Sequence, residues 1–101
     1  MALATVDLSA FAPIGAHTSN SSLGSVVNLS NGIPSGADQL LIQALTQNVR
    51  FTLDGTDPTA SLGFQLKAGD PPMIIPIGAT GQIIKVIQET AGAVIQFQWG
   101  S

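Results

Sequence analysis

The chain has 101 residues with three basic and six acidic side chains, a net charge of −3 at pH 7, and no cysteine. A chain of this length forms one domain with a single modest core, and without cysteine it has no disulfides, thiolate metal sites or cysteine catalysis. The basic residues Arg50, Lys67 and Lys85 are scattered singly, and no apolar run approaches the roughly 20 residues of a bilayer span, so we expect neither nucleic acid nor a membrane as a partner.

Residues 1–36 show little regular pattern. They are rich in glycine, proline and small polar residues, and only LGSVVNL at 23–29 has the composition of a strand. The first residues lack a positively charged start and carry Asp7 where the apolar segment of a signal peptide would run, so we do not expect secretion by that route. We predict an extended arm or edge segment at residues 1–36 and a compact β domain at residues 37–101.

Four residues of this arm are our candidates for contact with a partner: Phe11, Pro13, Ile14 and His17. An extended apolar segment suits contact with a neighbouring protein, and it equally suits packing on its own domain. His17 is the only histidine and has no acidic cluster near it in the sequence, so it cannot assemble a zinc site or a histidine-based triad.

From residue 38 onward, short apolar segments recur between glycine, proline, aspartate and asparagine. They are DQLLIQALT (38–46), NVRFTL (48–53), GFQLKAG (63–69), MIIPI (73–77), QIIKVIQ (82–88) and AVIQFQW (93–99). Six or seven short strands at this spacing predict an all-β fold, a small antiparallel β-sandwich or barrel. Residues 37–46 also fit a short helix, because Leu41 and Leu45 have helical spacing; we predict a strand there.

The last strands carry the clearest alternation. Ile95, Phe97 and Trp99 point to one face, which is the period of two that a half-buried strand needs. Gly92 predicts a turn that joins segments 82–88 and 93–99 in an antiparallel hairpin. Pro76 cannot donate a ladder hydrogen bond, so segment 73–77 is expected at an edge or a bulge.

The predicted core follows from the same alternation. It comprises Phe51, Leu53, Ile84, Val86, Ile95, Phe97 and Trp99. The aromatic pair near the C-terminus also allows a second interpretation, a platform on which a sugar ring could stack. We favour the core, because an aromatic pair at the end of an amphipathic strand is usually buried.

The stretch NVRFTLDGTDPTAS at 48–61 runs from a strand into a turn with two aspartates. Asp54-Gly55 is a frequent turn pair, because glycine accepts positive φ and an aspartate side chain bonds to nearby backbone amides. Asp57-Pro58 begins a second turn, because proline fixes φ and holds the preceding residue extended. We predict that this segment is a structural turn with no catalytic residue.

Two chemical interpretations of the same segment compete with the turn. A hard cation needs six or more oxygen ligands, and the candidates are Asp54, Thr56, Asp57, Thr59 and Asp70. A pair of carboxylates for glycoside hydrolysis needs a cleft and a raised pKa on one of them, and nothing in the sequence indicates a cleft. We therefore expect no enzyme, no metal and no cofactor.

So few charges leave an unusual exterior. A typical soluble surface carries about a quarter or more charged positions, whereas much of this one must consist of hydroxyls, amides and apolar atoms. Such a surface suits coverage by another protein. The alternative is that the abundant asparagine and glutamine are enough for solubility.

The run GADQLLIQALTQNVRFTLDGTDPTASLGFQLKAGDPP, with the tail ending GAVIQFQWG, resembles a family of small virion structural proteins of tailed bacteriophages and prophages. The likeness covers about residues 36–100, and residues 1–35 lie outside it. VRFTLDGTDPTAS is also similar to a hairpin of the small Ig-like domains of chitobiases, where the motif shapes a sandwich corner and carries no catalysis.

The first resemblance implies a non-enzymatic virion protein, most simply a capsid decoration or cement protein located in the virion and assembled in the bacterial cytoplasm. Its expected partner is the major capsid protein or another virion protein. A homo-oligomer, with a trimer favoured, would add avidity on a repeating lattice. The alternative is a carbohydrate-binding or tail accessory module that contacts host glycans through Phe64, Phe97 or Trp99 with the aspartates of the loop at 54–57.

Overall fold

The computed structural model describes residues 11–78 and 81–101. The predictions made for residues 1–10 of the arm, including Asp7, lie outside this range. The strands are β1 (Thr18–Asn20), β2 (Val27–Asn28), β3 (Gln39–Leu45), β4 (Val49–Thr52), β5 (Phe64–Leu66), β6 (Met73–Pro76), β7 (Lys85–Gln88) and β8 (Val94–Gly100), and a short 3₁₀ helix, η2 (Leu29–Gly32), follows β2. In the described residues, no helix has the length and apolar character to cross a membrane.

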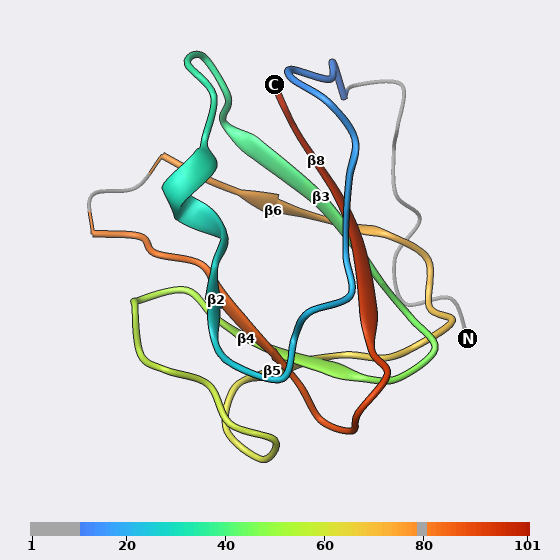
Figure 1. The fold of residues 1–101 in the computed structure, drawn as a ribbon. Coiled ribbons are helices and arrows are strands. Elements are labelled where there is room, and N and C mark those ends of the chain that lie inside the picture. The colour runs from blue at the N-terminus through green and yellow to red at the C-terminus, as the bar shows by residue number, and fades with distance from the viewer. Residues whose placement is uncertain (1–10, 79–80) are drawn as a thin grey trace.

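The strands form two four-stranded sheets packed face to face. Sheet A has the order β1-β8-β3-β6 and sheet B the order β2-β7-β4-β5, and every paired strand is antiparallel. Figure 1 shows β3, β6 and β8 in the upper layer and β2, β4 and β5 in the lower one. The predicted all-β sandwich is confirmed.

The connectivity refines this class. The chain passes from one sheet to the other at every connection except β4–β5. Eight antiparallel strands in these two orders have the topology of a jelly roll, which occurs in viral capsid and lectin domains among others. The fold by itself does not select among such functions.

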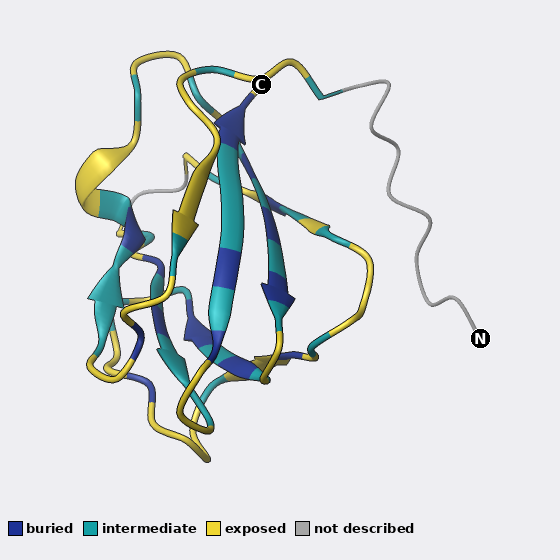
Figure 2. Cartoon of the chain, turned by 45° about the vertical axis from the view of Figure 1, so that its right-hand side comes forward, coloured by how far each residue is buried: buried dark blue, intermediate teal, exposed yellow. Residues whose placement is uncertain are grey.

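Alternating side chains explain why residues 39–45 form a strand. Leu40, Ile42 and Ala44 are buried, whereas the residues between them are half-buried. Figure 2 shows the same alternation of dark blue and teal along the central strands of sheet A. The strand prediction for this segment is confirmed, because its apolar residues alternate with a period of two and its backbone pairs on both sides with β6 and β8.

The core lies between the sheets and includes most of the predicted residues. Phe51, Ile84, Val86, Ile95 and Trp99 are buried, and Leu53 and Phe97 are half-buried against them. Sequence reasoning did not select several other fully buried residues, which are Leu23, Leu40, Ile42 and Val49.

The predicted hairpin of the last two strands is wrong. β7 pairs with β2 and β4 in sheet B, whereas β8 pairs with β1 and β3 in sheet A. The segment around Gly92 therefore carries the chain across the sandwich. Both strands have one apolar face, and these faces meet across the core, so the turn residues alone could not distinguish a crossing from a hairpin. The prediction for Pro76 is confirmed, because β6 is the end strand of sheet A.

The described part of the predicted arm lies along both sheets. β1 pairs with β8 and β2 pairs with β7, so each forms the end strand of its sheet. Upstream of β1, the amide of Ala12 donates to the carbonyl of Ser101, and the amide of Ile14 donates to the carbonyl of Trp99. These hydrogen bonds continue the pairing between the N-terminal segment and β8 beyond β1.

Candidate functional site

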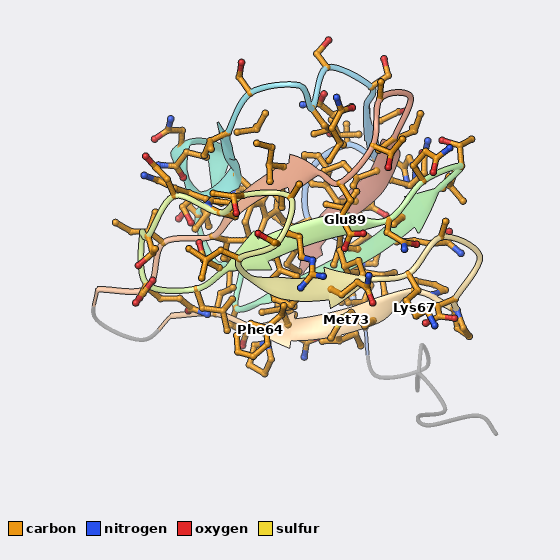
Figure 3. All side chains as sticks on the ribbon, turned by 90° about the horizontal axis from the view of Figure 1, so that it is seen from below. Phe64, Lys67, Met73 and Glu89 are labelled. Atoms are coloured by element: carbon orange, nitrogen blue, oxygen red, sulfur yellow. The ribbon has the colours of Figure 1, made fainter. Side chains whose placement is uncertain are left out.

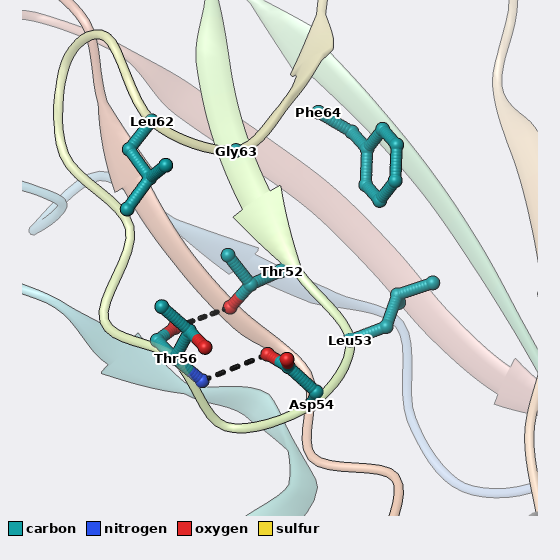
Figure 4. Close-up of a pocket in the computed structure, with 7 residues that line it drawn as sticks. All are labelled: Thr52, Leu53, Asp54, Thr56, Leu62, Gly63 and Phe64. Carbon is teal, nitrogen blue, oxygen red and sulfur yellow. Dashed lines mark hydrogen bonds between the residues drawn. The ribbon is translucent and has the colours of Figure 1, made fainter.

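The loop between β4 and β5 is the segment in which the sequence placed two aspartates. Asp54 accepts a hydrogen bond from the backbone amide of Thr56 at 3.0 Å, and Thr52 donates its hydroxyl proton to the carbonyl of Thr56. Gly55 between them has a φ of +87°, which the turn requires and other residues rarely adopt. Figure 4 shows both hydrogen bonds. Asp54 and Gly55 thus lie in a local turn.

The second aspartate holds this loop against sheet B. The Asp57 carboxylate accepts from the Lys85 ammonium of β7 at 2.8 Å. Its neighbour Pro58 is fully buried, and the Asp57 side chain is 71% exposed. Asp57 and Pro58 therefore bind the loop to the sheet beneath it.

The hydrogen bonds of Asp54 favour the ionised form of its carboxyl. The backbone amide of Thr56, followed by the hydroxyl of the same residue, lowers the pKa of the Asp54 carboxyl. A general acid at neutral pH needs a raised pKa. In the described residues, no group of three histidine, cysteine or acidic side chains is placed to hold a metal ion.

Beside this turn lies an open hollow of about 480 Å³. It is lined by Thr52, Leu53, Asp54, Thr56, Leu62, Gly63 and Phe64. Phe64 is 61% exposed and Leu62 is 50% exposed. The ring of Phe64 lies 5.5 Å from that of the buried Phe51, measured between centroids, so its orientation is supported by the core. The lining of the hollow thus includes an aromatic residue, an aspartate and two threonines.

The other proposed aromatic platform is buried. Trp99 is 6% exposed, and its ring packs edge-to-face with Phe97 at a centroid distance of 6.4 Å. Both residues also line a hollow of about 380 Å³ beside β1 and β2, together with Asn20 and Asn28. With 6% of its surface exposed, Trp99 offers little area on which a sugar could stack.

The four predicted interface residues contact their own domain. The Phe11 ring packs on Gly100, where an added Cβ would lie 2.5 Å from its Cζ atom. Pro13 forms a bridge to Gly100, and Ile14 bonds to β8 as described above. The His17 Nε2 atom lies 2.6 Å from the Gln96 Oε1 atom. In the single chain, these residues pack against or bond to β8 beside the β1 edge of sheet A.

The outer face of sheet B carries ion pairs. Arg50 on β4 donates to Glu89 at 2.6 Å, and Gln65 on β5 donates to the same carboxylate at 2.7 Å. The hydrogen bond from Gln65, then the hydrogen bond and charge of Arg50, lower the pKa of Glu89. With the pair between Lys85 and Asp57, this face and its loop hold most of the charges of the chain.

Within the described part of the chain, no ion pair lies on the outer face of sheet A. Strand register and alternation place on it Ser19, Gln39, Leu41, Gln43, Leu45, Ile74, Pro76, Val94, Gln96 and Gln98. In Figure 2 sheet A faces the viewer, and much of this surface is teal or yellow. Among the described strand residues, the outer face of sheet B thus carries ion pairs, whereas that of sheet A carries amides, a hydroxyl and aliphatic groups, with the His17 imidazole beside Gln96.

Two glutamines on this face have a defined orientation. Gln43 donates its amide to the carbonyl of Asp70 at 3.1 Å, and Gln98 donates to the carbonyl of Gly15 at 3.0 Å. Because a carbonyl can only accept, it is the NH₂ group of each side chain that these contacts engage. The Gln39 Oε1 atom is buried with no partner in the described part of the chain. The backbone of neighbouring segments therefore holds the Gln43 and Gln98 amides in place.

The sequence analysis did not predict the outer face of sheet A as a single surface. It did show that Val94, Gln96 and Gln98 share a face, and the matching pattern in residues 39–45 was a second signal. The pairing of β3 with β8, which brings Gln43 opposite Gln96, was not predicted.

The chain matches no protein-family model, and searches of curated proteins and of solved structures find no match.

Proposed function

We propose that the protein is a non-enzymatic structural protein of a bacteriophage virion, a decoration or cement protein that binds the head shell through the outer face of sheet A. The observation that carries this proposal is the separation of charge between the two faces of the sandwich. Burying a charged side chain in an interface has a large desolvation cost, and the centres of protein interfaces are depleted of charge. Sheet A has a face that can be covered without this cost, and sheet B keeps its ion pairs in solvent.

The orientation of the glutamine amides indicates which hydrogen-bonding groups the partner surface would supply. The NH₂ groups of Gln43 and Gln98 donate within the chain, so we expect their side-chain oxygens to pair with N–H or O–H donors of the partner. Each such contact is weak, but a repeating shell presents the same surface many times, and avidity follows when copies are linked. The resemblance of residues 36–100 to virion proteins of tailed phages supports the head shell as that surface and the virion as the location. A position on the tail is the related alternative.

Binding to undecorated shells tests the proposal. The protein is expected to sediment with shells that lack their decoration protein and to raise the temperature at which they open. Leu41→Glu places a charge in the centre of the sheet A face and is expected to abolish binding. Ile87→Glu makes the same change on a half-buried residue that faces outward from sheet B, and it is expected to leave binding intact. Equal binding by both variants would refute the assignment of the face.

A carbohydrate-binding module is the second candidate, and one observation favours it. The exposed ring of Phe64 shares a hollow with the Asp54 carboxylate and the Thr56 hydroxyl, which is the chemistry that orients a sugar. Calorimetric titration with oligosaccharides of bacterial surfaces tests it, with Phe64→Ala as the variant expected to lose binding. Heat release that survives this substitution would exclude the hollow.

A further inference from the structure

One end strand of sheet B contains no proline and no charged residue. Natural edge strands are guarded by charges, prolines or bulges or by being very short, because their free backbone groups accept another strand, and of these devices this strand has its length of three residues. β6, the corresponding end strand of sheet A, ends at Pro76 and follows two prolines. β5 consists of Phe64, Gln65 and Leu66, and no described strand pairs with its second edge. Its backbone is therefore available to another strand.

Exposed apolar side chains surround this edge. Phe64 is 61% exposed and Leu62 just before it is 50% exposed, although both belong to the most hydrophobic residue types. Phe64 and Lys67 mark the two ends of β5 in the view from below (Figure 3). Because Phe64 packs on Phe51, its exposed surface is held in place before any partner arrives, and burying it costs little further side-chain entropy.

We propose that β5 pairs with β5 of a second copy in an antiparallel, two-fold dimer centred on Gln65. The strand is self-complementary in this arrangement, because Phe64 of each copy lies opposite Leu66 of the other and both side chains are on the inner side of the sheet. Lys67 falls opposite Gly63 of the second copy, so no like charges meet. The two sheets B become one continuous sheet.

The two-fold symmetry of the dimer fixes the direction in which the two sheet A faces point. A two-fold axis that relates neighbouring antiparallel strands is perpendicular to their sheet, so the inner and outer sides coincide in the two copies. Both outer faces of sheet A therefore point in the same direction. If the proposed function holds, the dimer docks on a shell with two such faces at once, which raises its avidity. Like edges pair only about a two-fold axis, so the proposed assembly is a dimer and differs from the trimer favoured in the sequence analysis.

Sedimentation velocity over a range of concentrations tests the association without any shell, so failure here and failure of shell binding are separate results. The wild-type chain is expected to sediment at twice its mass of 10.3 kDa. Phe64→Lys is expected to weaken the dimer at least about tenfold. Ile33→Lys changes an exposed apolar residue away from β5, 39% exposed, and is expected to leave the dimer unchanged. A monomer at every concentration, a trimer, or a Phe64→Lys dimer of wild-type strength would overturn the proposal.

A single cysteine maps the contact, because the chain contains none of its own. Directly opposite residues of antiparallel strands have Cα atoms about 4.5–5.5 Å apart, which lies within the range of a disulfide. Gln65→Cys is therefore expected to form a disulfide-linked dimer under mild oxidation with a disulfide reagent. Gln98→Cys, on the outer face of sheet A, is the control. Equal cross-linking of the two variants would contradict the two-fold axis at Gln65.

Discussion

Two adjacent leucines of β3 test the orientation of the sandwich. Leu40 is fully buried between Trp99 and Ile75 of the neighbouring strands, whereas Leu41 faces outward and is half-buried. Replacement of a fully buried leucine by alanine costs about 3–5 kcal/mol, because the lost transfer energy is added to the energy of a cavity. The same change at Leu41 leaves no enclosed cavity and is expected to cost about 1 kcal/mol.

The free energy of unfolding is measured by urea titration, with Trp99 fluorescence as the signal because this residue is the single tryptophan and is buried. For a domain of this size each kcal/mol corresponds to about 4–8 °C in Tm, so thermal unfolding separates the two variants clearly. A slip of one residue in register would exchange the two faces of the strand. If Leu41→Ala were as destabilising as Leu40→Ala, the register of β3 and the assignment of the outer face would both be wrong.

Three further predictions concern the edge, the loop and the ion pairs. Gly100→Ala is expected to lower the free energy of unfolding, because the new Cβ would lie 2.5 Å from Phe11 and 2.7 Å from the Ala12 carbonyl. The control in the same urea titration is Gly32→Ala, whose new Cβ would have no atom within 4 Å. Equal stabilities of the two variants would mean that residues 11–14 do not pack on Gly100. Asp57→Asn removes an exposed ion pair and is expected to cost no more than about 1 kcal/mol; loss of the fold in circular dichroism would contradict this. The folded pKa of Glu89 lies below its ordinary value of 4.5, so its contribution to stability is present above that value and is lost as pH falls through the folded pKa. Glu89→Gln is therefore expected to lose less stability than the wild type between neutral and acidic pH, and an equal loss would assign the effect to other groups.

The local predictions succeeded where a side chain's role depends on its immediate neighbours. Alternation placed Ile95 and Trp99 in the core, and the missing donor of Pro76 placed its strand at an edge. β1 was missed because its residues are polar and largely exposed, so only its pairing with β8 makes it a strand. Leu23 was missed because it stands apart from any periodic run, although it is fully buried.

The candidate sites also differ in whether the sequence could predict them. The turn at Asp54 and Gly55 was predictable, since its hydrogen bond joins residues two positions apart. The outer face of sheet A combines residues from β1, β3, β6 and β8, and no local pattern states that these strands are neighbours. The exposed edge at Phe64 depends on the same information, because a strand is an edge only when its place in the sheet is known.

The sequence by itself determined most elements of this protein: its strands apart from β1, its turns, the alternation that separates core from surface, and the scarcity of charge. These follow from interactions within a few residues, which the order of amino acids specifies directly. Only the tertiary structure decided the jelly-roll pairing, the crossing between β7 and β8, and the collection of the charges on sheet B. Strand pairing depends on contacts between distant segments that compete over the whole chain, and many pairings satisfy the same local pattern.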